Sequence, residues 1–161
     1  MTKNEAMVAF LKTCPTIQSS PLFFNFGDVN DNTHQVNTRG DEKSLQKPFV
    51  DGSVKKRYTF MVDTFKSVSY NAIVDTGTAP TADENMSEFQ EVQGILDWVN
   101  EQGDLRNFPN FGELCVIDEM KTTTEKPELL GVYSTKNTPM ALYRISIQID
   151  FVDNTNKIWN K

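Results

Sequence analysis

Cysteine and histidine are scarce in this 161-residue chain, which contains two cysteines and one histidine. Two cysteines are too few for a disulfide scaffold, and a structural zinc site usually needs four cysteine or histidine ligands. A nucleophilic pair of a cysteine with His34 stays arithmetically open. However, Cys14 and Cys115 fall on predicted apolar faces, where cysteine acts as a small hydrophobic side chain. We therefore predict no metal site.

Long apolar runs and an excess of basic residues are also missing. No run approaches the roughly 20 residues that a membrane-spanning helix needs. The first residues include Glu5 and lack the apolar stretch of a signal peptide, so we expect a protein made and kept in a cytoplasm. The net charge of −6 and the pI of about 4.8 disfavour a general nucleic-acid-binding surface. We predict neither a membrane nor a specific nucleic-acid partner.

The residues that are present suffice for a folded core. Hydrophobic residues make up 38% of the chain, and 11 of its residues are phenylalanine. This content excludes wholesale disorder, and the length is that of one domain. We predict a single domain over residues 1–161.

Two segments have the apolar periodicity of helices. The first begins at Thr2, which forms a capping-box pattern with Glu5, and ends before Pro15. The second follows a cap at Thr81, ends near a C-terminal cap at Gly103, and carries one apolar stripe. Its stripe consists of Met86, Phe89, Val92, Leu96 and Val99, which we interpret as core packing.

Alternation of apolar and polar residues predicts several strands. The clearest runs from 141 to 152, where Ile145, Ile147 and Ile149 should be buried on one face. Shorter strands are predicted at 22–26 and 114–117, and a longer one at 58–70 whose change of parity suggests a bulge near residue 63. The order of elements predicts an α+β fold, a mainly antiparallel or mixed β-sheet with two α-helices packed on it.

Residues 27–48 are almost entirely polar. A stretch of this length with so little apolar content is not expected to join the core. Loops this long are usually functional or disordered. We predict a long polar loop or arm.

One motif resembles a catalytic site. Asp75-Thr76-Gly77 follows an apolar run, as does the catalytic aspartate of aspartic proteases, and Leu129-Leu130-Gly131 imitates a later element of a retroviral-type protease. In a protease of that type, the intervening chain forms a flap hairpin, whereas here it forms a predicted amphipathic helix. An Asp-Thr-Gly turn at a strand end is also common. With no glycine-rich nucleotide loop either, we predict no catalytic residue, no cofactor and no enzyme.

Charge is strongly segregated along the chain. No lysine or arginine occurs between Ser67 and Leu105, whereas acidic residues are frequent there. A basic cluster stands at the start of a predicted strand. Solvated surfaces explain both features, but an interface between unlike faces of neighbouring subunits is the alternative. Its hypothetical contact residues are Lys55, Lys56 and Arg57 against Glu84, Glu88 and Glu91.

Several stretches together resemble a known group of proteins. These are Phe10–Pro15, Tyr58–Phe60, Phe89–Gln102, Asn107–Pro109 and Ile145–Phe151. They are similar to small minor capsid proteins encoded in the head–tail region of long-tailed phages and prophages of Gram-positive bacteria. The order of elements resembles that of tail-terminator, or tail-completion, proteins.

The resemblance implies a structural virion protein without enzymatic activity. Such a protein forms a homo-oligomer, a hexameric ring that caps the tail tube and joins it to the head connector. It implies partners in the tail tube and connector, and a location in the virion after synthesis in the host cytoplasm. A small cytoplasmic domain that binds a peptide or metabolite is the alternative, and a protease-like dimer using Asp75 is a further one.

Overall fold

A computed structural model describes residues 2–25, 32–37, 42–68, 84–134 and 139–158. Three helices and seven strands are found there. The helices are α1 (Lys3–Leu11), α2 (Pro15–Gln18) and α3 (Glu84–Asp104). The strands are β1 (Leu22–Phe24), β2 (Thr33–Asn37), β3 (Glu42–Ser44), β4 (Val54–Ser67), β5 (Cys115–Thr122), β6 (Glu128–Ser134) and β7 (Pro139–Asp153).

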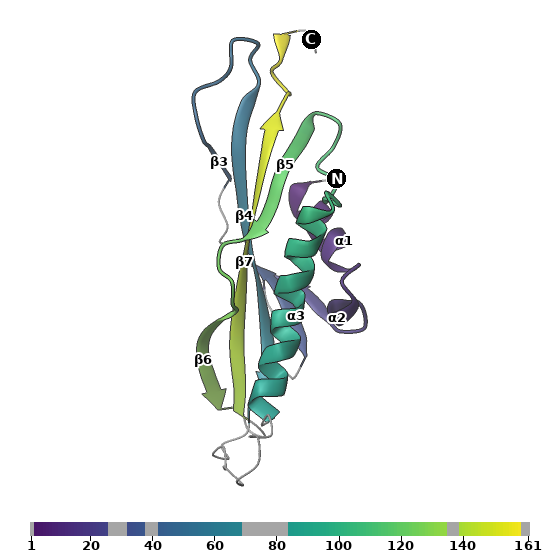
Figure 1. Ribbon diagram of the computed structural model, residues 1–161, viewed down its shortest axis with the longest axis vertical. Helices are drawn as coiled ribbons and strands as arrows, with labels where there is room; N and C mark the ends of the chain where they lie inside the picture. The colour runs from purple at the N-terminus through teal and green to yellow at the C-terminus, as the bar shows by residue number, and fades with distance from the viewer. Residues whose placement is uncertain (1, 26–31, 38–41, 69–83, 135–138, 159–161) are drawn as a thin grey trace.

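The centre of the fold is a pair of very long strands, β4 and β7. They pair antiparallel from Val54 opposite Asp153 to Ser67 opposite Met140, which gives the molecule its elongated shape (Figure 1). The sheet has the order β1-β2-β4-β7-β5, with β3 also beside β4 and β6 also beside β7. Only β1 and β2 pair in parallel in this sheet of described strands. The predicted α+β fold with a mainly antiparallel sheet is confirmed.

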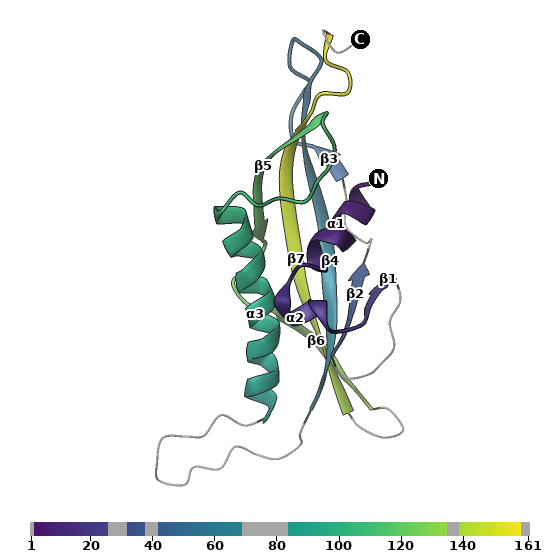
Figure 2. The same cartoon turned by 90° about the vertical axis from the view of Figure 1, so that its right-hand side faces the viewer.

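All three helices cover one face of the sheet (Figure 2). Alternate residues of the central strands face them, because successive side chains of a strand point to opposite faces. The predicted burial of the last strand is confirmed, since Ile145, Ile147 and Ile149 are fully buried while Arg144, Ser146 and Gln148 are partly exposed. None of the helices in the described part of the chain is long and apolar enough to cross a bilayer.

The apolar stripe of helix α3 is buried from Val92 onward. Val92, Leu96 and Val99 are buried as predicted, whereas Met86 near its start is exposed. Gly103 was predicted to cap this helix but lies inside it. A Cβ atom there would lie 2.1 Å from the carbonyl oxygen of Met120, so the glycine permits a close approach of α3 to β5. The predicted cap at Thr81 falls outside the described residues.

The prediction of a long polar loop or arm at 27–48 is wrong for the described residues of that segment. Strands β2 and β3 lie within it, and both pair with β4. Strand β2 is only five residues long, and its buried face contains His34 and Val36. Two of the three buried residues of β2, Thr33 and His34, are polar, which hides the usual alternation of apolar and polar residues.

The bulge predicted in the strand at 58–70 is also absent. β4 pairs with β7 without a shift of register, and Phe65 lies on the face opposite to the helices. Bulges occur instead in β5, between Ile117 and Glu119, and in β6, between Leu129 and Gly131.

Candidate functional site

A buried lysine is the most unusual charged group in the described part of the chain. Lys66 near the end of β4 is 1% exposed. Its ammonium group contacts Glu91 and Asn32, and lies 3.3 Å from Glu88 Oε2. Glu88 and Glu91 both come from α3, so this cluster joins the helix to the sheet. One cation between two carboxylates leaves the cluster with a net negative charge.

The single histidine lies close to this cluster. His34 on β2 is also buried, and its Nδ1 lies 2.8 Å from Thr64 Oγ1 on β4. Its Nε2 has no hydrogen-bond partner among the described residues. Burial, and then the positive charges of Lys66 and Lys12, lower the pKa of His34 to about 4. The imidazole is therefore neutral at pH 7 and forms part of the core.

The three predicted basic interface residues are not brought together on one surface. Lys56 faces the helix side of the sheet, where it binds Asp153 at 3.0 Å. Lys55 and Arg57 alternate to the other face, and Arg57 makes two hydrogen bonds to Asp150, of 2.8 and 3.1 Å. Each of these cations thus has a partner within its own chain.

The acidic half of the predicted interface is partly engaged as well. Glu88 and Glu91 pair with Lys66, as described above. The position of the Glu84 side chain lies outside the description. The interface between unlike charges stays a prediction, and forming it would require these groups to share or exchange their partners.

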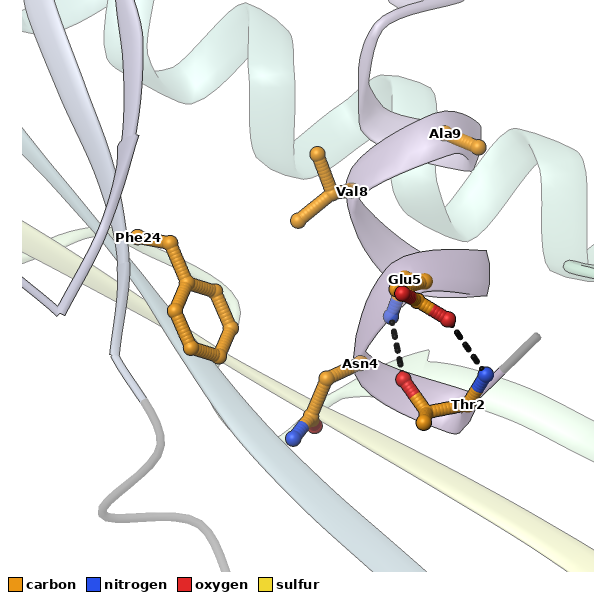
Figure 3. A pocket seen from close by; sticks show the side chains of 6 residues that line it. All are labelled: Thr2, Asn4, Glu5, Val8, Ala9 and Phe24. Carbon is orange, nitrogen blue, oxygen red and sulfur yellow. Dashed lines mark hydrogen bonds between the residues drawn. The ribbon is translucent and has the colours of Figure 1, made fainter.

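An opening of about 650 Å³ lies between α1 and β1 (Figure 3). Phe24 faces Val8 across it. The polar side chains on its rim serve the fold, because Thr2 and Glu5 form the predicted capping box, with hydrogen bonds of 3.2 and 2.7 Å. Asn4 accepts a hydrogen bond from Tyr58. The opening is thus mainly apolar.

A second opening, of about 200 Å³, separates the edge strand β6 from the first half of α3. Its walls are mainly apolar, and a carboxylate of α3 lies at one side. The lining residues are Ser67, Val68, Asn85, Glu88, Leu129, Val132, Ala141 and Tyr143. Burial, and then the charge of Glu88, raise the pKa of Tyr143. We call this opening the β6–α3 groove.

The described side chains do not form a cluster of metal ligands. No three or more His, Cys, Asp or Glu residues among them are placed to hold a metal ion. Cys14 is buried at the start of α2, and burial raises the pKa of its thiol and of the Cys115 thiol. Asp75-Thr76-Gly77 lies outside the described residues.

Neither a protein-family model nor a curated protein sequence matches the chain. The function must therefore be argued from the residues and the geometry.

Sequence reasoning missed the two most distinctive features of this region. Lys66 follows Phe65 in a strand and offers no sign of burial, because the carboxylates that neutralise it come from a helix more than 20 residues away. Strand β6 was hidden by Gly131 and by its bulge, which disrupt the alternation expected of a strand. The absence of basic residues between Ser67 and Leu105 was the one available clue, because it leaves Lys66 as the nearest preceding cation.

Proposed function

We propose that this protein is a structural subunit of the phage head–tail region that assembles into a ring, caps the tail tube and joins it to the head connector. The proposal rests first on the resemblance of its sequence stretches to small minor capsid and tail-terminator proteins. A role of this kind needs stable surfaces for neighbouring subunits, and it needs no catalytic group.

The observation that best supports an assembly role is the extended central sheet. Its described outer strands differ on the two sides, with β1 and β3 on one side and β5 and β6 on the other. A subunit with two unlike sides suits head-to-tail association, which closes into a ring when the rotation between neighbours allows it. Apolar side chains are exposed on several of these strands, among them Phe24, Val116 and Leu129.

Sedimentation velocity over a wide protein concentration range tests the proposal, combined with negative-stain electron microscopy. We expect rings at high concentration or on added phage tail tubes. A strict monomer in both settings would contradict it. The charged interface has its own test. Lys55 is the least tightly paired of the three cations, because its Nζ lies 4.0 Å from Asp118. Reversing its charge with Lys55→Glu should weaken ring formation if that interface is used.

A domain that binds a peptide or metabolite is the second candidate, and the apolar opening between α1 and β1 favours it. Binding of a small apolar fluorophore that is lost in Phe24→Asp would support it. We do not propose the protease. Leu129-Leu130-Gly131 belongs to the edge strand β6, and α3 occupies the chain where a flap hairpin would be needed.

A further inference from the structure

Strand β6 is an outer strand of the sheet with apolar side chains on its surface. It pairs with β7, and no other described strand lies on its far side. Leu129 is 54% exposed, and Val132 and Tyr133 are about as exposed. The backbone groups on the outer edge of such a strand are a template for another extended segment.

The bulge in β6 brings two of these side chains to the same face. Leu129 and Val132 are three positions apart, so a regular strand would direct them to opposite faces. The bulge between Leu129 and Gly131 adds one residue, so Leu129 pairs with Tyr143 and Val132 with Ala141. Tyr143 and Ala141 are two positions apart on β7, so Leu129 and Val132 point to the same face. Both side chains therefore line the β6–α3 groove.

The charge around this groove is negative. Glu88 Oε2 lies at its helix side and accepts no hydrogen bond from any residue that the structure describes, although Lys66 Nζ lies 3.3 Å away. Glu91 shares the same lysine. Helix α3 has no lysine or arginine. On the sheet side, Arg144 is held by Asp63 on the other face. An apolar groove beside an acidic helix favours an occupant with apolar and basic side chains.

We infer that the β6–α3 groove binds an extended, basic segment of another protein, which adds to β6 as a further antiparallel strand. Alternate apolar side chains of that segment enter the groove between Leu129, Val132 and Tyr143, and its lysine or arginine side chains lie beside Glu88. Backbone hydrogen bonds to β6 supply a sequence-independent part of the binding, and the groove supplies the selectivity.

A second copy of this chain fits less well. Pairing of β6 with β6 around a two-fold axis would place two acidic α3 helices on the same face of the joined sheet. Like charges across an interface oppose association. The basic residues Lys55 to Arg57 are unavailable as an added strand, because β4 is already paired on both sides.

The groove shares Glu88 with the acidic half of the predicted ring contact, so binding is measured at protein concentrations below those at which rings form. A capped synthetic peptide of alternating valine and threonine, with a lysine at each end, is the probe. Its control has glutamate in place of both lysines. We expect the full chain to bind the lysine peptide in fluorescence anisotropy, and the glutamate peptide about tenfold more weakly.

Hydrogen exchange shows where the probe binds. Amides of Glu128–Ser134 should exchange more slowly with the lysine peptide present. Leu129→Thr and Val132→Thr alter exposed side chains, so the fold should survive, but each should weaken binding several-fold. Val116→Thr is the matched control on β5 and should bind normally.

Three results would overturn the inference. These are no binding of the lysine peptide at millimolar concentration, equal binding of both peptides, and binding without added protection in β6. Protection of β6 that rises with protein concentration in the absence of peptide would assign the edge to a second copy instead. Failure of rings to form in sedimentation leaves these outcomes unchanged, so the two proposals fail separately.

Discussion

Arg144 on β7 and Asp63 on β4 lie directly opposite each other on the face of the sheet away from the helices. The guanidinium donates two hydrogen bonds to the carboxylate, of 2.8 and 3.0 Å. Asp63 is 1% exposed, and Gln35 donates a further hydrogen bond to it. A second pair of the same type has its strands exchanged, with Arg57 on β4 and Asp150 on β7.

Removing the arginine should therefore be costly at one position and mild at the other. Arg144→Met leaves a buried carboxylate with only Gln35, and we expect a loss of about 3–5 kcal/mol in the free energy of unfolding. Arg57→Met leaves Asp150, whose side chain is 10% exposed and keeps more contact with water than that of Asp63, and we expect a smaller loss of about 1–2 kcal/mol. Urea denaturation of both variants measures the difference. Equal losses would show that burial does not decide the strength of these pairs.

Lys66 gives a second prediction, which concerns the cost of a buried charge. Lys66→Met replaces the ammonium with an apolar side chain of similar volume, while Glu88 and Glu91 keep access to water. We expect stability to change by no more than about 1 kcal/mol. The double variant Glu88→Gln with Glu91→Gln leaves the ammonium buried without a carboxylate, and should cost about 3–5 kcal/mol. The reverse order of effects in thermal or urea unfolding would contradict this account.

The third prediction is a dependence of stability on pH that arises from His34. Its pKa falls from the ordinary value of 6.5 to about 4 on folding. Between these two values the unfolded chain binds a proton that the folded chain does not, so stability should fall as the pH is lowered from 6.5 to 4. The loss of stability is absent above pH 6.5, where His34 is neutral in both states. It reaches about 3 kcal/mol below pH 4.

The chain has one histidine, so His34→Gln isolates this effect. The variant should lose the slope between pH 6.5 and 4 in urea titrations at fixed temperature. The low pKa of Asp153, about 2, affects stability only below the range in which His34 titrates. A slope of the same size in both proteins would show that carboxylates, not His34, control this range.

The two glycines of α3 should respond in opposite directions to the same substitution. A Cβ atom added at Gly94 would have no neighbouring atom within 4 Å, so Gly94→Ala should stabilise the protein by about 0.5–1 kcal/mol. Gly103→Ala would drive a Cβ into the carbonyl oxygen of Met120, and should destabilise it by about 1–3 kcal/mol. Their urea midpoints, compared with that of the unchanged protein, provide the measurement.

The sequence predicted the parts of the fold in which apolar periodicity is long and regular. The last strand and the buried part of the α3 stripe follow directly from Ile145, Ile147 and Ile149, and from Val92, Leu96 and Val99. The capping box of Thr2 and Glu5 was equally readable, because both partners lie within one turn.

The parts that the sequence did not predict depend on distant partners. Strand β2 is held by pairing with β4, and its buried polar residue His34 is accommodated by Thr64 on that strand. The basic run at Lys55 to Arg57 looked like one surface, but a strand divides neighbours between two faces. Burial of Lys66 needs two carboxylates from α3, which no local pattern indicates.

The long pairing of β4 with β7 also has a consequence for how quickly the chain folds. Its two ends join residues roughly 100 and roughly 70 positions apart in the chain, so the central ladder closes large loops before most of its contacts form. Among the described strands, β5 and β6 pair only with β7, β3 pairs only with β4, and β2 joins β1 to β4. Assembly of the sheet therefore waits for the meeting of two segments from distant parts of the chain, and we expect refolding on the slow, millisecond-to-second scale of proteins with high contact order.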